Sequence, residues 1–204
     1  MIPAGSRWIR VLLGLCAVKV VLLIVLFDPS GLVAFDLPKS LASRAIEWPI
    51  AAVLVIVFVT YGRSIVPRSR LHPAAFAVAL AWLVAAYFAE DRFLALFGED
   101  DRYLGLTYLA DMLLLYVACA VAVRSARDAG VLFAAIALGG AFALGYAGAQ
   151  AIGADPFRWQ QGADRPFSTF GNPDHFGHFL SVLFALSFGA LLASGGWIGA
   201  TTGA

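Results

Sequence analysis

Long apolar runs alternate with short polar segments along this sequence. A helix needs about 20 apolar residues to cross about 30 Å of hydrocarbon, and six runs approach that length. They lie near residues 8–27, 46–66, 74–89, 104–123, 129–152 and 175–194. The pattern predicts an all-α fold, a transmembrane bundle of about six spans that forms one domain over residues 1–204 within a lipid bilayer.

The composition supports a membrane setting, because 61% of the residues are hydrophobic and only 13% are charged. Soluble domains have roughly 45–50% apolar and 25% charged residues. Cys16 and Cys119 both fall inside apolar runs, where a cysteine behaves as a small buried hydrophobe rather than as part of a disulfide framework or metal site. We therefore expect no metal, no cofactor and no nucleic-acid partner. The first apolar run is too long for a cleaved signal peptide and is predicted to be retained.

Charge divides unequally between the two sides of the predicted bundle. If the N-terminus is cytoplasmic, the inner side carries seven arginines (7, 10, 63, 68, 70, 124 and 127) and one acid, at 128. The outer side carries six basic residues and eleven acids, in longer and more aromatic segments at 28–45, 90–103 and 153–174. Short arginine-rich loops are typical of the cytoplasmic side. The sequence thus predicts a cytoplasmic N-terminus and places the polar chemistry outside.

Two charged residues, Lys19 and Asp111, fall well inside predicted spans. A charge at mid-helix costs about 2.5–3.5 kcal/mol on insertion scales, so it usually faces a partner or a wet cavity. Both lie roughly 10–12 Å below the outer surface at 1.5 Å per residue. An intramembrane Lys19–Asp111 ion pair is one interpretation. In the other, Lys19 extends towards the interface and Asp111 is hydrogen-bonded or protonated.

The segment around the start of the sixth run has local features of an anion site. Gly171 permits a tight turn, Asn172 is a good N-cap and Pro173 suits the first helical position. The free N–H groups and positive dipole end of this helix, with Arg165 beside them, suit a phosphate or diphosphate. The alternative is a capped helix with an exposed arginine, and Asp174 favours it because a carboxylate already occupies the helix start.

His175 and His178 share a helix face at this position, but zinc needs at least one further ligand, and only Asp174 is near in sequence. A local structural role is the simpler interpretation. Phe157, Trp159, Phe167 and Phe170 are typical of an aromatic belt at the headgroups. In the 90–106 segment, the apolar stretch 93–97 predicts a short piece that dips into the interface. Arg102 follows three acids, so it suits either a local salt bridge or a substrate contact.

Three segments together resemble the bacterial O-antigen ligase and polymerase superfamily. They are Phe-Asp-Leu-Pro-Lys at 35–39, Phe-Gly…Asp-Arg-Tyr-Leu-Gly-Leu at 97–106, and the arginine followed by Gly-Asn-Pro at 165–173. The resemblance covers essentially the whole chain, although the intervening spans match only in being apolar.

The resemblance implies an enzyme of the bacterial inner membrane that takes a glycan from undecaprenyl diphosphate in the outer leaflet. The glycan passes to lipid A–core, to another glycan or to a protein, without a nucleotide sugar. By resemblance, Arg165 and Arg102 hold the diphosphate and stabilise it as it leaves, since the guanidinium fork suits phosphate. Lys39, Asn172 and His175 are the further candidate substrate-binding residues.

The chain departs from this family in two ways. Family members more often have asparagine at the position of Asp174. They are also about twice as long, and a histidine in a large later loop is their usual candidate for activating the acceptor. We therefore expect an N-terminal portion of a ligase-like protein, inactive alone. Two other classes stay open, a transporter of a small anion such as bicarbonate, which would use Lys19 and Asp111, and a non-catalytic membrane scaffold.

Overall fold

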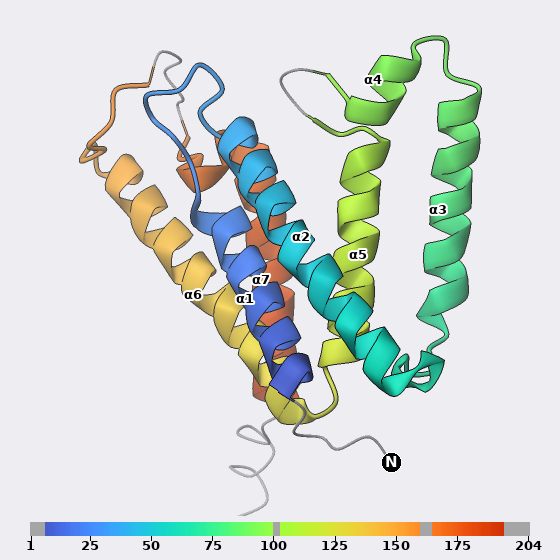
Figure 1. Ribbon diagram of the computed structural model, residues 1–204. Coiled ribbons are helices and arrows are strands. Elements are labelled where there is room, and N and C mark those ends of the chain that lie inside the picture. Colours follow the sequence, from blue (N-terminus) through green and yellow to red (C-terminus); the bar gives the residue numbers. More distant parts are fainter. Residues whose placement is uncertain (1–6, 100–102, 160–164, 194–204) are drawn as a thin grey trace, which may run out of the picture.

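Every regular element in the described part of the chain is a helix. The computed structural model describes residues 7–99, 103–159 and 165–193. The long helices are α1 (Arg7–Val25), α2 (Asp36–Tyr61), α3 (Leu71–Tyr87), α5 (Leu106–Ala122), α6 (Ala126–Ala151) and α7 (Pro173–Ala193). The short ones are η1 (Arg63–Ile65), α4 (Arg92–Phe97) and η2 (Ser168–Phe170). The predicted all-α fold is confirmed, and the long helices run up and down between two ends (Figure 1).

Helix α1 is the central element of the bundle, because it packs against α2, α5 and α6. Its fully buried Leu12 and Cys16 meet Ile50 and Val57 of α2 and Val121 of α5 in one apolar core. Helices α3 and α7 lie at the periphery. None of the side chains of α3 is buried, and α3 packs against α4 and α5 only at one side (Figure 1).

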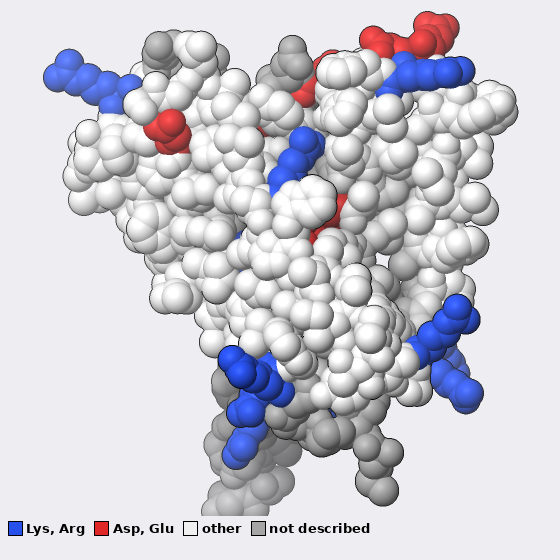
Figure 2. All heavy atoms as spheres, viewed as in Figure 1, with Lys and Arg blue, Asp and Glu red and all other residues white. Residues whose placement is uncertain are grey.

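Among the described residues, four helices are long and apolar enough to cross a membrane, namely α1, α2, α6 and α7, which indicates a membrane protein. Helices α3 and α5 are apolar but have 17 residues each. The starts of α1, α3 and α6 and the ends of α2 and α5 lie at one end of the bundle, together with the seven arginines at 7, 10, 63, 68, 70, 124 and 127. We call this the arginine end. The opposite end, the acidic end, holds the α1–α2 loop, α4 and the α6–α7 connection, and on the face drawn in Figure 2 the surface between the two ends is largely white.

The largest departure from the predicted boundaries is the start of the second helix. Helix α2 begins at Asp36 instead of near 46, so the segment 36–45 is helical and not loop. The hydropathy pattern misses this segment because of its polar side chains. Its sequence is compatible with a helix, since Pro38 falls in the first turn, where its missing N–H costs little. Pro49 consequently lies inside the helix rather than in its first turn.

A short helix contains the apolar stretch 93–97, which the sequence predicts to dip into the interface. Helix α4 covers Arg92–Phe97, and the Asp91 carboxylate caps it by accepting a hydrogen bond from the N–H of Leu94 at 2.9 Å. An Asp side chain at this position satisfies an N–H that has no partner within the helix.

Gly139 lies where α6 and α1 pack closely, so a larger side chain at this position tests the packing of the bundle. A Cβ on Gly139 would stand 2.9 Å from Ile24 Cδ1, whereas one on Gly145 of the same helix would meet no atom within 4 Å. We expect Gly139→Leu to destabilise the protein by about 1–3 kcal/mol through overpacking. Gly145→Leu is the matched control and should retain the wild-type unfolding temperature or exceed it. Thermal unfolding in detergent measures both, and equal unfolding temperatures would contradict this packing.

Candidate functional site

The η2 turn connects the acidic ends of α1, α2 and α6. Lys39 Nζ of α2 donates a 2.6 Å hydrogen bond to the carbonyl oxygen of Thr169, and its ammonium lies 4.5 Å from the centre of the Phe170 ring. The Thr169 hydroxyl donates to the Ile24 carbonyl of α1 at 2.6 Å. The hydroxyl of Ser168 donates to the Ala143 carbonyl of α6, also at 2.6 Å. Both hydroxyl-bearing residues are fully buried, so the turn is fixed on three sides.

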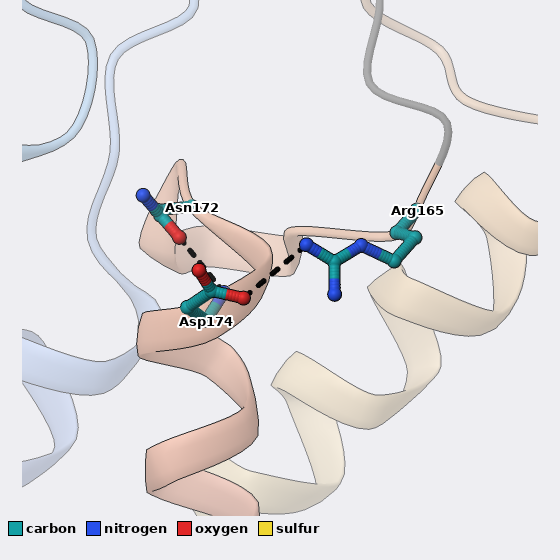
Figure 3. Close-up of polar contacts among 3 residues, drawn as sticks. All are labelled: Arg165, Asn172 and Asp174. Carbon is teal, nitrogen blue, oxygen red and sulfur yellow. Dashed lines mark hydrogen bonds and ion pairs between the residues drawn. The ribbon is translucent and has the colours of Figure 1, made fainter.

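Gly171 ends this turn in a conformation that only glycine adopts easily. Its φ is +70°, and an added Cβ would stand 2.3 Å from the Phe35 ring. Asn172 then caps α7 as predicted, because its Oδ1 accepts a 2.7 Å hydrogen bond from the N–H of Asp174. Figure 3 shows this cap beside Arg165.

Arg165 reaches the first turn of α7 and forms an ion pair there. Its Nη2 lies 3.2 Å from Oδ1 of Asp174, and both side chains are 69% exposed. An exposed pair of this kind contributes about 0–1 kcal/mol, so a ligand can compete for either partner. His175 follows in the same turn and is exposed. Arg165, Asn172 and His175 therefore gather at one helix start.

A pocket of about 300 Å³ opens at the acidic end between α1, α2 and α5. Its polar lining comes mainly from the early turns of α2 and includes Asp36, Lys39, Ser40, Ser43, Arg44 and, from α5, Asp111. Its remaining lining side chains are Leu23, Tyr103, Leu104, Tyr108 and Met112. Arg44 crosses from α2 to α5, where its Nη2 donates to the Thr107 hydroxyl at 3.0 Å. Lys39 and Asp111, which the sequence assigned to separate roles, line the same pocket.

The loop before α5 is closed by a direct contact between two glycines. A Cβ on Gly98 would stand 2.4 Å from the Leu104 nitrogen, and one on Gly105 would stand 2.4 Å from the Gly98 nitrogen. Tyr103, in the closed loop, has a φ of +54°, which is rare for a non-glycine residue. Arg102, predicted to contact the diphosphate, lies outside the described residues.

Lys19 pairs with Glu47 of α2, and this corrects the predicted Lys19–Asp111 pair. Lys19 is fully buried and Glu47 is 7% exposed, and the two side chains form an ion pair in the interior. The sequence counted Glu47 among the acids of the outer side, at the start of the second span, but α2 begins at Asp36 and so carries Glu47 inside the bundle opposite α1. Asp111 of α5 lies within electrostatic range of Lys19, so the three charges form one cluster beneath the pocket.

An aromatic cluster beside η2 is a feature that the sequence did not reveal. Trp159 packs against Phe27, Phe35 and Phe167, and its indole N–H donates to Asp155 at 2.9 Å. Partial burial raises the pKa of Asp155, but hydrogen bonds from the Phe157 N–H and from the Gln150, Trp159 and Tyr146 side chains outweigh it and lower the pKa overall. Phe157, Trp159 and Phe167, predicted as a headgroup belt, thus also pack against one another or against Phe27 and Phe35.

The residues that the structure describes contain no group of three His, Cys, Asp or Glu side chains placed to hold a metal ion. Comparison of the chain with protein-family models, with curated proteins and with solved structures gave no match. The geometry of the acidic end and the resemblance of its three segments therefore carry the functional argument.

The buried ion pair predicts a double-mutant effect. Lys19→Met leaves Glu47 buried without a counter-charge and should destabilise the protein by about 3–5 kcal/mol, as removal of one buried partner does. The double variant Lys19→Met, Glu47→Leu should recover most of this loss. Unfolding in detergent measures the coupling free energy between Lys19 and Glu47. The Asp111→Asn variant tests in the same way whether Asp111 is coupled to Lys19. The alternative outcome is that Lys19→Met restores the stability lost in Asp111→Asn but not the stability lost in Glu47→Leu. The partner of Lys19 would then be Asp111.

The aromatic cluster predicts a pH dependence. The pKa of Asp155 is lower in the folded protein than in the unfolded chain, so the charged carboxylate stabilises the fold above its ordinary pKa. This stabilisation is lost as the pH falls through the folded pKa. Asp155→Asn should therefore lower the unfolding temperature at pH 7, and the difference from wild type should shrink below about pH 4. A constant difference from pH 7 to pH 3 would contradict the role of this charge.

Proposed function

We propose that this chain takes part in the transfer or polymerisation of a glycan carried on undecaprenyl diphosphate, at the outer face of the bacterial inner membrane. In this proposal the chain crosses the membrane six times with its N-terminus in the cytoplasm. Helices α3 and α5, with 17 residues each, extend about 25 Å at 1.5 Å per residue, which lies at the lower limit for a span. The arginine end then faces the cytoplasm, in keeping with the distribution of basic residues in short loops.

One observation carries the functional proposal: the three segments that resemble the ligase superfamily converge at the acidic end. Phe35 packs on Gly171, and Lys39 bonds the carbonyl of Thr169, so the first and third segments touch. Tyr103 and Leu104 of the second segment line the pocket that Lys39 also lines. These segments are distant in sequence, and a shared site accounts for their convergence.

In the proposed reaction, Arg165 binds the diphosphate beside the N-terminus of α7. An arginine keeps its charge and offers phosphate a planar fork, and the helix start adds N–H groups and a favourable dipole. When an acceptor hydroxyl attacks the anomeric carbon, it releases its proton to the solvent, the bond from that carbon to the phosphate oxygen breaks, and the diphosphate leaves with additional negative charge. Arg165 stabilises that charge. Asp174 opposes binding, because its carboxylate occupies the position beside the guanidinium.

Transport of a small anion is the second candidate function, and the buried cluster of Lys19, Glu47 and Asp111 favours it. Charges within a bundle are typical of ion and substrate pathways. A transporter of a small anion would depend on these residues and tolerate loss of Arg165. A glycan transferase would depend on Arg165 and tolerate removal of the Lys19–Glu47 pair in the double variant.

Binding of inorganic diphosphate to the chain in lipid nanodiscs tests the proposed site. Arg165→Ala should weaken binding, and Asp174→Asn should tighten it by about 5-fold, since removing a like charge near 4 Å changes the interaction by about 1 kcal/mol even in water. Arg158→Ala is the matched control, because it removes an arginine from the same end without an ion pair to α7 in the described structure. Equal affinity of wild type, Arg165→Ala and Asp174→Asn would refute the anion site.

A further inference from the structure

The pocket between α1, α2 and α5 has the chemistry of a polyol site rather than of an anion site. Its charged side chains balance, with Lys39 and Arg44 opposed by Asp36 and Asp111. A diphosphate needs an excess of donors and positive charge. A sugar hydroxyl donates one hydrogen bond and accepts two, so it suits a surface on which carboxylates, cations and serine hydroxyls alternate.

The pocket also offers the apolar surface that a sugar ring requires. Tyr103 and Tyr108 contribute rings that carry a polar hydroxyl on an apolar body. The volume of about 300 Å³ lies at the lower limit of ligand pockets, roughly 300–1,000 Å³. Most of the surface that the pocket exposes is apolar, so the ring faces of a sugar can lie against it while the polar side chains bond the hydroxyl groups.

The backbone beside the pocket is strained at Tyr103. Tyr103 has a φ of +54°, and in the described residues only Ser168 shares a positive φ among non-glycine residues. Such a conformation is unfavourable for a residue with a side chain and persists only where the surrounding structure holds it. The Gly98–Gly105 contact closes the loop and holds Tyr103 against the pocket. Ser168 belongs to the η2 turn, which Lys39 contacts through the carbonyl of Thr169.

We propose that this pocket binds the sugar residues of the glycan, next to the α7 start where the diphosphate binds. The proposal rests on the proposed function for the identity of the whole substrate. Lys39 joins the two regions, since it lines the pocket and bonds the η2 turn three residues before Asn172. Because Thr169 and Phe170 already hold its ammonium, Lys39 acts as a positioning residue between them. Ser40, Arg44 and Tyr108 are the side chains assigned to the sugar.

Saturation-transfer NMR on the full chain in nanodiscs tests this assignment, with glucose, galactose and N-acetylglucosamine as probes and inorganic diphosphate as a competitor. At least one sugar should give a signal with wild type. Tyr108→Leu, which removes a ring face and hydroxyl, and Ser40→Trp, which fills the pocket, should each reduce that signal at least fivefold. Tyr87→Leu is the matched control, because Tyr87 is 74% exposed at the same end and lies outside this pocket.

The outcomes separate this proposal from the proposed function. Sugar binding that is kept in Arg165→Ala and is unaffected by diphosphate supports the pocket, even if diphosphate binding itself proves independent of Arg165. The proposal is overturned if no sugar binds, if the signal survives in both pocket variants, or if diphosphate displaces the sugar from the wild-type protein. Unfolding temperatures establish that each variant is folded, and Tyr108→Leu alone decides the matter if Ser40→Trp does not fold.

Discussion

The ion pair between Lys19 and Glu47 is the constraint on which the rest of this structure depends. A fully buried ammonium group requires a carboxylate in contact with it, because the interior offers no water to replace one. That contact places Glu47 of α2 opposite Lys19 of α1, beside the apolar core that the two helices share. Ser43 lies one turn before Glu47 on the same helix, and Lys39 and Ser40 lie two turns before it. The side of α2 that carries Glu47 therefore also lines the pocket.

The acidic end is assembled from contacts that leave little freedom. Two buried hydrogen bonds reach α6 and α1 from Ser168 and Thr169 of η2, and a partly buried one joins Lys39 of α2 to the same turn. Three positions, Gly98, Gly105 and Gly171, require glycine because a neighbouring chain or ring comes too close for a Cβ. Polar groups in such an arrangement keep their positions before a ligand arrives, which lowers the entropic cost of binding. Positive φ angles at Tyr103 and Ser168 are sustained by the same packing.

The cationic side chains at the acidic end differ in how firmly other groups of the protein already bind them. Lys39 is engaged by a carbonyl oxygen and an aromatic ring, and Arg44 by the Thr107 hydroxyl. Arg165 is held by a single ion pair to an equally exposed carboxylate. Since exposed pairs contribute little and are screened by salt, Arg165 is the one of these three cations most readily transferred to an anionic ligand. This difference assigns positioning to Lys39 and anion binding to the α7 start.

Local rules were enough to predict the helical class, the approximate apolar stretches and the capped start of α7. Asn172 bonds a residue two positions away, and a contact of that range can be read from neighbours in the chain. The partner of Lys19, the early start of α2, the cluster around Asp155 and the pocket were not predictable in this way. Each depends on side chains from different helices, as Lys39 and Thr169 show with 130 positions between them. The sequence by itself determined which segments are apolar enough to become helices, because hydropathy is a property of neighbouring residues. Only the tertiary structure decided which charges meet, because a buried charge can pair only with a group that helix packing places beside it.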